Sequence, residues 1–239
     1  MPDAPSARWE PDPVLRELLF TDFDGLPAEP DDVIADALDG GYVERTEGLV
    51  ALLRDEGADP AARFLACCAL CSWADPIGYA TVVEAAGAPE DLAWRGQTYD
   101  RFNSQDDTFA HLAEAVGRSR DMVDERGTAA ERIEAARALI RIADRVQLDR
   151  SANDLLYPEI VSACRGDLVA VVDRGIARLA AGGHLEFDLG VQLALFINAL
   201  AASEPAWAVD AGHRLAAAHP GDRALRELVE SGGSSLWLM

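Results

Sequence analysis

Helical periodicity of the apolar residues is the feature of this sequence that most restricts its fold. The segment 128–146, TAAERIEAARALIRIADRV, carries an apolar stripe at helical spacing, and Thr128 with Glu131 has the pattern of a capping box. The stripe consists of Ile133, Ala136, Ile140 and Ala143. Comparable segments of about ten to twenty residues, each closed by Gly, Pro or Asp, follow one another along the chain. No stretch alternates as a strand would, so the sequence predicts an all-α chain of about a dozen helices joined by short turns.

Part of this pattern is repeated within the chain. Aligning ARFLACCALCSWAD (62–75) with ERIEAARALIRIAD (131–144) matches Arg63 with Arg132 and Asp75 with Asp144, at an offset of 69 residues (131 minus 62). The offset is about twice the length of a two-helix repeat. Repeated helix pairs bury their apolar faces against their neighbours and leave an extended concave surface, which usually binds a ligand or partner.

Residues 52–86 show the features of a known repeat. An Asp-Pro pair opens a helix, an arginine follows, and an Ala-Leu helix ends in a second Asp-Pro pair. These residues are Asp59, Pro60, Arg63, Ala66, Ala69, Leu70, Asp75 and Pro76. The segment resembles a HEAT-like repeat of the bilin-lyase type, and departs from it at Cys67, Cys68, Cys71 and Trp73, where small or aliphatic residues are usual. Residues 205–229 resemble the second half of a tetratricopeptide unit. Both families are α-α superhelices, so the resemblance implies a HEAT-like solenoid and leaves the repeat family open.

The predicted organisation has three parts. An acidic helical cap covers 1–45, the HEAT-like helical repeats cover 46–231, and a C-terminal tail covers 232–239. The tail places Leu236–Met239, Leu-Trp-Leu-Met, after a glycine-serine stretch. We expect these apolar residues to dock, either on the same chain or across a dimer, and the oligomeric state is left open.

The motif TDFDGLP, at 21–27, resembles the nucleophilic aspartate motif of haloacid-dehalogenase phosphatases. That aspartate requires the end of a buried parallel strand, whereas Val14–Leu19 shows helical spacing. Leu26 stands where the family has threonine, and also where a calcium loop would place a third oxygen ligand. The sequence therefore favours a helix that stops at Gly25, followed by an acidic loop.

Charge restricts the possible partners. The formal net charge is −21, and residues 1–60 hold sixteen acidic residues and four arginines, a local charge of −12 (4 minus 16). Such a field repels nucleic acid and anionic lipid and favours a cationic partner, although solubility alone is an alternative explanation. Binding of a DNA lesion in a HEAT-like groove is disfavoured because that groove must be basic. All basic residues are arginine, which excludes lysine Schiff-base chemistry and a Walker-type lysine.

Cysteine content and hydropathy suggest neither a metal nor a membrane. Cys67, Cys68, Cys71 and Cys164 form neither a disulfide framework nor a complete zinc set, and small buried side chains are the simpler interpretation. We expect no metal and no cofactor. Without an apolar run of membrane-spanning length or the features of a signal peptide, the expected location is the cytoplasm.

Segment 91–109 combines aromatic, arginine and amide residues, the composition of interface hot spots. Burial of its aromatic side chains between two helices is the alternative. The predicted partner-binding residues, including two N-terminal acids, are Trp94, Tyr99, Arg101, Phe102, Asp106, Asp107, Asp31 and Asp32.

Two further helix faces carry charged residues. Asp107, His111 and Glu114 share one face, suited to a metal or acid-base chemistry, although an exposed, salt-bridged histidine is commoner. Arg137, Arg141 and Arg145 line another face, which we expect to be salt-linked.

The leading hypothesis is a non-enzymatic, protein-binding α-solenoid with no catalytic residue. Its most concrete form is an inhibitor or immunity-type protein for a basic partner, such as a toxin directed against nucleic acid, with carboxylates presented where phosphates would lie. The alternative is a small-molecule-binding or lyase-like enzyme that uses the concave face, with Asp107, His111, Glu114 or the cysteines as the working residues.

Overall fold

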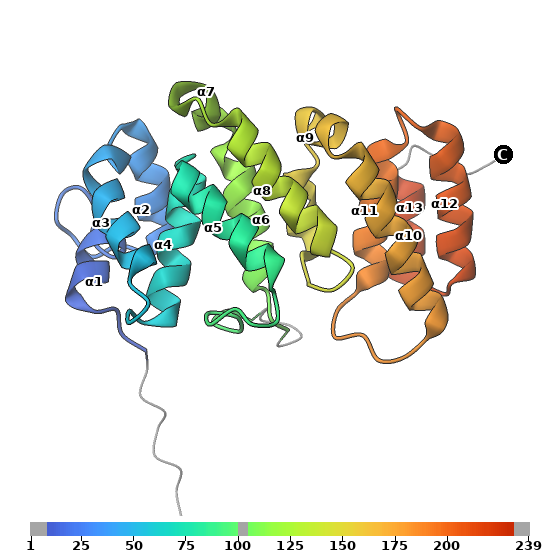
Figure 1. Ribbon diagram of the computed structural model, residues 1–239, viewed down its shortest axis with the longest axis horizontal. Coiled ribbons are helices and arrows are strands. Elements are labelled where there is room, and N and C mark those ends of the chain that lie inside the picture. Colours follow the sequence, from blue (N-terminus) through green and yellow to red (C-terminus); the bar gives the residue numbers. More distant parts are fainter. Residues whose placement is uncertain (1–8, 100–104, 232–239) are drawn as a thin grey trace, which may run out of the picture.

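The computed structural model describes residues 9–99 and 105–231, which form thirteen α-helices and three short 3-10 helices, with no strand among them (Figure 1). The predicted all-α chain is therefore confirmed. The first seven helices are α1 (Pro13–Leu19), α2 (Pro30–Asp36), α3 (Tyr42–Arg54), α4 (Pro60–Ser72), α5 (Pro76–Gly87), α6 (Thr108–Arg118) and α7 (Val123–Arg126). The others are α8 (Ala129–Ile142), α9 (Pro158–Ala163), α10 (Arg165–Ala181), α11 (Leu189–Leu200), α12 (Pro205–Ala217) and α13 (Asp222–Ser231). The 3-10 helices are η1 (Ala37–Asp39), η2 (Ser119–Met122) and η3 (Asp149–Leu155).

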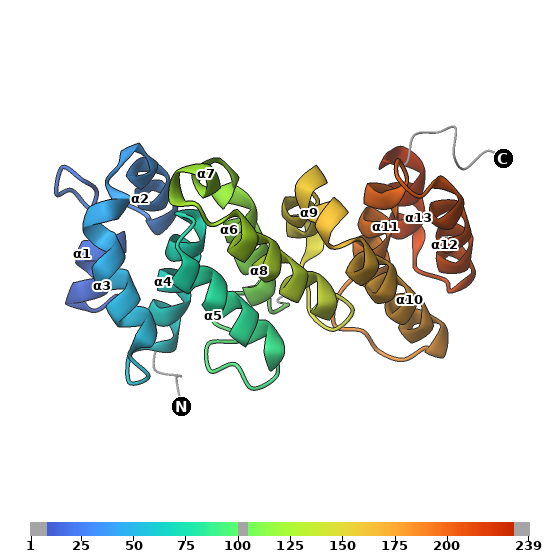
Figure 2. The same ribbon diagram turned by 45° about the horizontal axis from the view of Figure 1, so that its top comes forward.

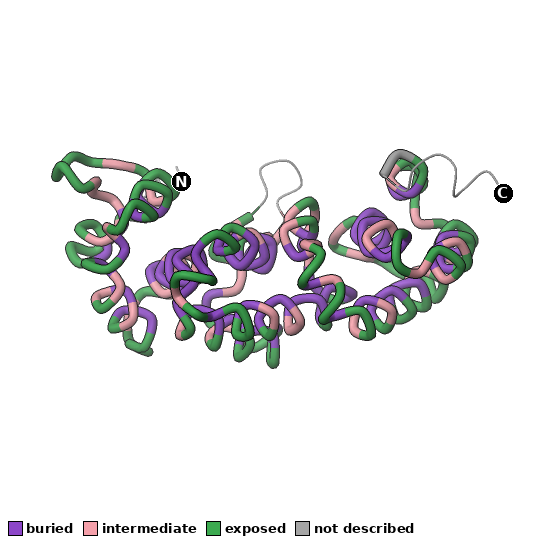
Figure 3. The backbone as a smooth tube through the Cα atoms, turned by 90° about the horizontal axis from the view of Figure 1, so that it is seen from above, coloured by how far each residue is buried: buried purple, intermediate pink, exposed green. Residues whose placement is uncertain are grey.

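The helices lie in chain order from one end of the molecule to the other, in two layers (Figures 1 and 2). One layer contains α5, α8, α10 and α12, and the other contains α4, α6, η3, α11 and α13. Seen from above, the array is an arc whose two ends turn to the same side (Figure 3). The second layer lies on that concave side.

Asp-Pro pairs begin three of the helices. In each pair the aspartate accepts hydrogen bonds of 2.8 to 3.3 Å from backbone N–H groups of the first turn, and proline occupies a position that needs no donor. The pairs are Asp12-Pro13, Asp59-Pro60 and Asp75-Pro76. Local sequence therefore sets where α1, α4 and α5 begin.

The two aligned segments use their matched residues in the same way. On α4, Arg63 Nε donates to the carbonyl of Leu53, in the last turn of α3, at 3.1 Å. On α8, Arg132 Nε donates to the carbonyl of Val116, in the last turn of α6, at 3.0 Å. Each arginine thus satisfies a carbonyl that has no partner within its own helix.

The matched aspartates also have the same role. Asp75 accepts from Arg126 at 2.6 Å, and Asp144 accepts from Arg174 at 2.8 Å. Both carboxylates are buried and link the end of one helix to another helix. The alignment at an offset of 69 residues therefore corresponds to shared structural positions (131 minus 62).

One continuous core runs from Leu15 to Leu228, so α1 to α3 pack on the rest of the chain. The indole of Trp73, which is fully buried, donates to the carbonyl of Ile34 at 3.0 Å and joins α4 to α2. The boundary predicted after residue 45 lies inside α3. Among the described residues, no helix is both long and apolar enough to cross a membrane.

The predicted capping box at the start of α8 was wrong. The hydroxyl of Thr128 makes no cap hydrogen bond with its own helix, and instead donates to the carbonyl of Ala74 at 2.9 Å. Ala74 has a left-handed φ of 54°, at the turn between α4 and α5. Because Thr128 is buried against that turn, a tertiary hydrogen bond replaces the local one. The α-helix also ends at Ile142, four residues before the predicted end at 146.

Candidate functional site

The loop that carries the TDFDGLP motif is held by a buried arginine. The guanidinium of Arg45 donates to the carbonyls of Leu18 at 2.7 Å, Thr21 at 2.8 Å and Asp22 at 3.1 Å. It also lies 4.0 Å from the centre of the Phe23 ring. The loop between α1 and α2 therefore has a fixed shape.

The motif does not form a phosphatase site. Helix α1 precedes it, so Asp22 does not follow a strand. The Asp22 carboxylate accepts from the N–H groups of Asp24 at 2.9 Å and Leu26 at 2.7 Å, which closes the turn. The helix expected to stop at Gly25 ends at Leu19 instead, and Gly25 supplies a left-handed φ of 82° within the loop.

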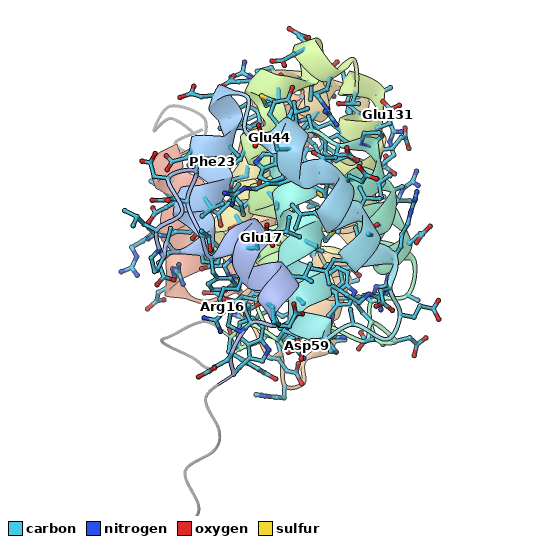
Figure 4. All side chains as sticks on the ribbon, turned by 90° about the vertical axis from the view of Figure 1, so that its left-hand side faces the viewer. Arg16, Glu17, Phe23, Glu44, Asp59 and Glu131 are labelled. Carbon is cyan, nitrogen blue, oxygen red and sulfur yellow. The ribbon has the colours of Figure 1, made fainter. Side chains whose placement is uncertain are left out.

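This loop, η1 and the start of α3 expose both apolar side chains and carboxylates. Val43 is 64% exposed, Leu26 61% and Phe23 42%. We call this region the N-terminal surface, and its members are Phe23, Asp24, Leu26, Leu38, Asp39, Val43 and Glu44. Phe23 and Glu44 lie on the same end of the molecule (Figure 4). Sequence reasoning missed its apolar members, although Leu26 lies two residues after Asp24 and Val43 is followed by Glu44.

The N-terminal carboxylates differ from the others in their ion pairs. Within 9–60, only Glu10 and Asp31 lie within 4 Å of an arginine nitrogen, at 3.9 and 3.7 Å. Further along the chain, carboxylates pair repeatedly with arginine, as Asp167 does with Arg137 at 3.3 Å and Arg141 at 2.7 Å. The expected salt-linked face of α8 is confirmed for these two arginines. The negative charge of the first sixty residues is therefore largely unpaired inside the chain.

The two N-terminal acids predicted to bind a partner differ in their surroundings. Asp31 and Asp32 are both exposed in the first turn of α2. Asp31 pairs with Arg118, whereas Asp32 has no arginine within ion-pair distance among the described residues.

The residues of segment 91–109 that were predicted to bind a partner differ in their exposure to solvent. Trp94 is only 2% exposed and its ring packs against Phe64 with centroids 5.6 Å apart, so it belongs to the core and not to a partner-binding surface. Tyr99 is 57% exposed, which suits an interface. Arg101 and Phe102 lie outside the described residues.

Asp106 shapes its own segment. Its Oδ1 accepts from the hydroxyl of Thr108 at 2.6 Å and its N–H at 3.1 Å, and its Oδ2 accepts from Arg95 Nε at 2.9 Å. Its carboxylate therefore has internal hydrogen-bond partners, and its role in binding another protein stays a prediction.

Asp107, His111 and Glu114 share one face of α6, as predicted. His111 Nε2 lies 3.6 Å from an oxygen of Asp107, and Nδ1 lies 3.8 Å from an oxygen of Glu114. Glu114 also pairs with Arg118 at 2.5 Å. The group is a half-exposed row of polar side chains with His111 between two carboxylates, the arrangement that is commoner for such a histidine.

The cysteines lie in the core and not with that row. Cys67, Cys71 and Cys164 are buried, and Cys68 is half-buried. Burial raises the pKa of the Cys68 and Cys71 thiols well above the usual range. These thiols therefore stay protonated at neutral pH, which makes them poor nucleophiles and metal ligands. Among the described residues, no three His, Cys, Asp or Glu side chains are grouped for metal binding.

A cavity of about 790 Å³ is lined by three connecting segments. These segments run along the lower edge of the ribbon in Figure 1. Tyr99 and Asp106 line it from the segment between α5 and α6, and Arg145 lines it from the segment after α8. His184–Phe187 close the other side. Sequence reasoning did not bring these three segments together, because they are far apart in the chain.

Comparison with models of known protein families, with curated proteins and with solved structures found no match for this chain.

Proposed function

We propose that this chain is a non-enzymatic, cytoplasmic protein that binds a basic protein partner through its N-terminal surface. The observation that carries the proposal is the distribution of ion pairs. Carboxylates beyond residue 60 are repeatedly neutralised by arginines of the same chain, whereas Asp24, Asp39 and Glu44 have no arginine within ion-pair distance among the described residues. Unpaired carboxylates on a fixed surface attract a cationic protein over a Debye length and set its orientation.

The exposed apolar residues support a protein partner rather than solubility alone. Leu26 and Val43 lie on a loop and a helix whose positions Arg45 fixes. Apolar side chains at the centre of a protein interface supply most of its binding free energy, and charges at its rim supply specificity and association rate. An inhibitor or immunity-type role follows from this arrangement if the partner is a basic toxin.

The proposed fold of the chain, with the N-terminal surface at one end, is a HEAT-like α-α superhelix. Two observations support it: the matched roles of Arg63 and Arg132, and those of Asp75 and Asp144. In such arrays each helix pair packs only on its neighbours, so the end pair leaves a face that another molecule can cover.

The experiment compares two variants of equal net charge. The first replaces three carboxylates of the N-terminal surface: Asp24→Asn, Asp39→Asn and Glu44→Gln. The second replaces three exposed carboxylates elsewhere: Glu84→Gln, Asp91→Asn and Asp222→Asn. Both variants and the unaltered chain are immobilised and exposed to lysate of the native host at about 0.1 M and about 1 M salt, where the Debye length falls from about 10 to about 3 Å.

We expect one basic protein to be retained at low salt by the unaltered chain and the second variant. Because each exposed ion pair contributes about 0.2–1 kcal/mol, the first variant should bind the purified partner roughly ten-fold more weakly. Equal losses in both variants would indicate nonspecific attraction to net charge. Retention of no basic protein at low salt would overturn the proposal.

The cavity supports a second candidate function, small-molecule binding on the same fold. Its volume of about 790 Å³ is within the usual range for ligand sites, and Tyr99, Arg145 and Phe187 offer aromatic and cationic contacts. A thermal-shift screen of small metabolites tests this candidate, with Arg145→Gln as the matched variant. A ligand that stabilises the unaltered chain and not the variant would favour the cavity. A screen without any stabilising compound would count against it.

A further inference from the structure

An apolar groove lies between α9 and the end of α11. Its volume is about 360 Å³, and it is lined mainly by apolar side chains. Arg165, at its edge, is already paired with Glu204, so the groove offers little net charge. The lining apolar residues are Leu156, Pro158, Val161, Ala199 and Ala202. It therefore suits an uncharged, apolar segment.

Helix α13 packs on α11, the helix whose end forms one wall of this groove. Helices α11 and α13 pack against each other (Figure 2), and their contacts fix their relative direction. Near the start of both, a Cβ placed on Gly190 would lie 2.5 Å from the Pro220 carbonyl oxygen. Near their ends, Asn198 Nδ2 donates to the carbonyl of Glu227 at 2.9 Å. The two helices are parallel, so Ser231 is brought level with the end of α11, where Ala199 and Ala202 line the groove.

The sequence that follows α13 has the composition to fill the groove. Residues 232–235, Gly-Gly-Ser-Ser, have no bulky side chain, and Leu236–Met239 are all apolar. At about 3.3–3.6 Å per residue, the six residues from Ser231 to Trp237 span up to roughly 20 Å. A helix with its side chains is about 10–12 Å in diameter, so a path around half of it is about 16–19 Å. The segment is therefore long enough to reach the groove of its own chain.

We propose that Leu236–Met239 binds in the groove between α9 and the end of α11 of the same chain. The proposal is independent of the N-terminal surface, because α1 to α3 lie at the other end of the array from α13 (Figure 1). Docking covers Val161 and Ala202 and joins the last helix, α13, to α9, four helices earlier in the chain.

Photo-cross-linking tests the proposal directly. Trp237 is replaced by p-benzoylphenylalanine in the full chain, and the cross-linked residues are mapped by mass spectrometry in an equal mixture of ¹⁵N-labelled and unlabelled protein. We expect cross-links to 156–165 and 199–203, within one isotopic form. A charge placed in the groove by Ala202→Asp should reduce them by at least about five-fold, because an unpaired charge resists burial. The exposed Ala206→Asp, on α12, serves as the matched control.

Three results would overturn the proposal. They are cross-links dispersed over other surfaces, cross-links that join labelled to unlabelled chains, and equal cross-linking in Ala202→Asp and the unaltered chain. Circular dichroism of both Ala→Asp variants separates loss of docking from loss of folding. A second readout is hydrogen exchange of the α9 amides, which should accelerate in Trp237→Ser with Leu238→Ser. Unchanged exchange in that variant would also refute docking.

Discussion

The contact between α4 and α5 predicts opposite effects for two glycine substitutions in a single helix. Gly78 lies in the first turn of α5, where the two helix backbones approach closely. A Cβ there would lie 2.7 Å from the backbone nitrogen of Cys71 and 2.9 Å from the carbonyl carbon of Leu70. Gly87, the last residue of α5, has no atom within 4 Å of the corresponding position.

The magnitudes follow from two competing effects. Alanine is favoured over glycine in a helix interior by about 0.8–1.0 kcal/mol, so Gly→Ala without a clash is stabilising. At Gly78 the added methyl meets backbone that cannot rotate away, and overpacking of this kind typically costs about 1–3 kcal/mol. We expect Gly78→Ala to lower the free energy of unfolding by up to about 2 kcal/mol net. Gly87→Ala should raise it by up to about 0.5 kcal/mol, because the end of a helix gains less.

Urea denaturation followed by circular dichroism measures both changes. A destabilisation of 1 kcal/mol corresponds to a fall of about 2–4 °C in the melting temperature for a chain of this size, which thermal unfolding can resolve. The slope of the transition should be the same in both variants, since neither alters the surface exposed on unfolding. If Gly78→Ala proves as stable as Gly87→Ala, the close approach of α4 and α5 is incorrect.

Two further substitutions test the N-terminal loop and a half-buried carboxyl group, that of Asp154. Arg45→Lys removes a planar guanidinium that donates hydrogen bonds to three carbonyls. We therefore expect the free energy of unfolding to fall by about 1–3 kcal/mol and hydrogen exchange in 22–26 to accelerate. Unchanged exchange would contradict the anchoring role of Arg45. Burial raises the pKa of Asp154, so the folded state binds more protons than the unfolded state and stability falls as pH rises above its ordinary value of 3.8. Asp154→Asn should be the more stable protein at pH 7 and lose that advantage in acid, and a variant less stable at pH 7 would refute the assignment.

The parts of the fold that depend on neighbouring residues could be predicted. Asp59-Pro60 and Asp75-Pro76 fix the starts of α4 and α5 because the cap, the donor-free proline and the first turn are consecutive in the chain. The alignment of the two repeat segments likewise depends on spacing alone. Its physical meaning, an arginine that satisfies a carbonyl at the end of an earlier helix, emerged only from the contacts.

The residues that were misassigned have partners far away in the sequence. Thr128 fits a capping box locally, but its hydroxyl bonds to Ala74, 54 residues earlier. Trp94 and Tyr99 lie in the same stretch of aromatic and polar residues. The Trp94 ring nevertheless packs on Phe64, whereas the Tyr99 side chain is exposed to solvent. Periodicity assigns faces only within a helix, and the segment between α5 and α6 has no helix to set such a pattern.

Gln192 shows how such a long-range partner controls a candidate site. It is almost fully buried on α11, and its Oε1 accepts from the N–H groups of Leu148 at 2.8 Å and Asp149 at 3.1 Å. Its Nε2 donates to the carbonyls of Ala143 and Val146. One amide therefore satisfies four backbone groups of the segment that carries Arg145 into the cavity.

Two substitutions of Gln192 separate its packing from its hydrogen bonds. Gln192→Leu keeps the side-chain volume but leaves buried backbone N–H and C=O groups without partners. We therefore expect the free energy of unfolding to fall by about 2–4 kcal/mol. Gln192→Glu keeps the acceptor but sets a carboxylate against two carbonyl oxygens, so its loss should be larger at pH 7 than in acid, where the carboxyl can donate a proton. Urea denaturation at both pH values measures these effects, and hydrogen exchange of 145–149 reports the local loosening. A Leu variant as stable as the unaltered chain would mean that water satisfies the segment, and that the wall of the cavity does not depend on α11.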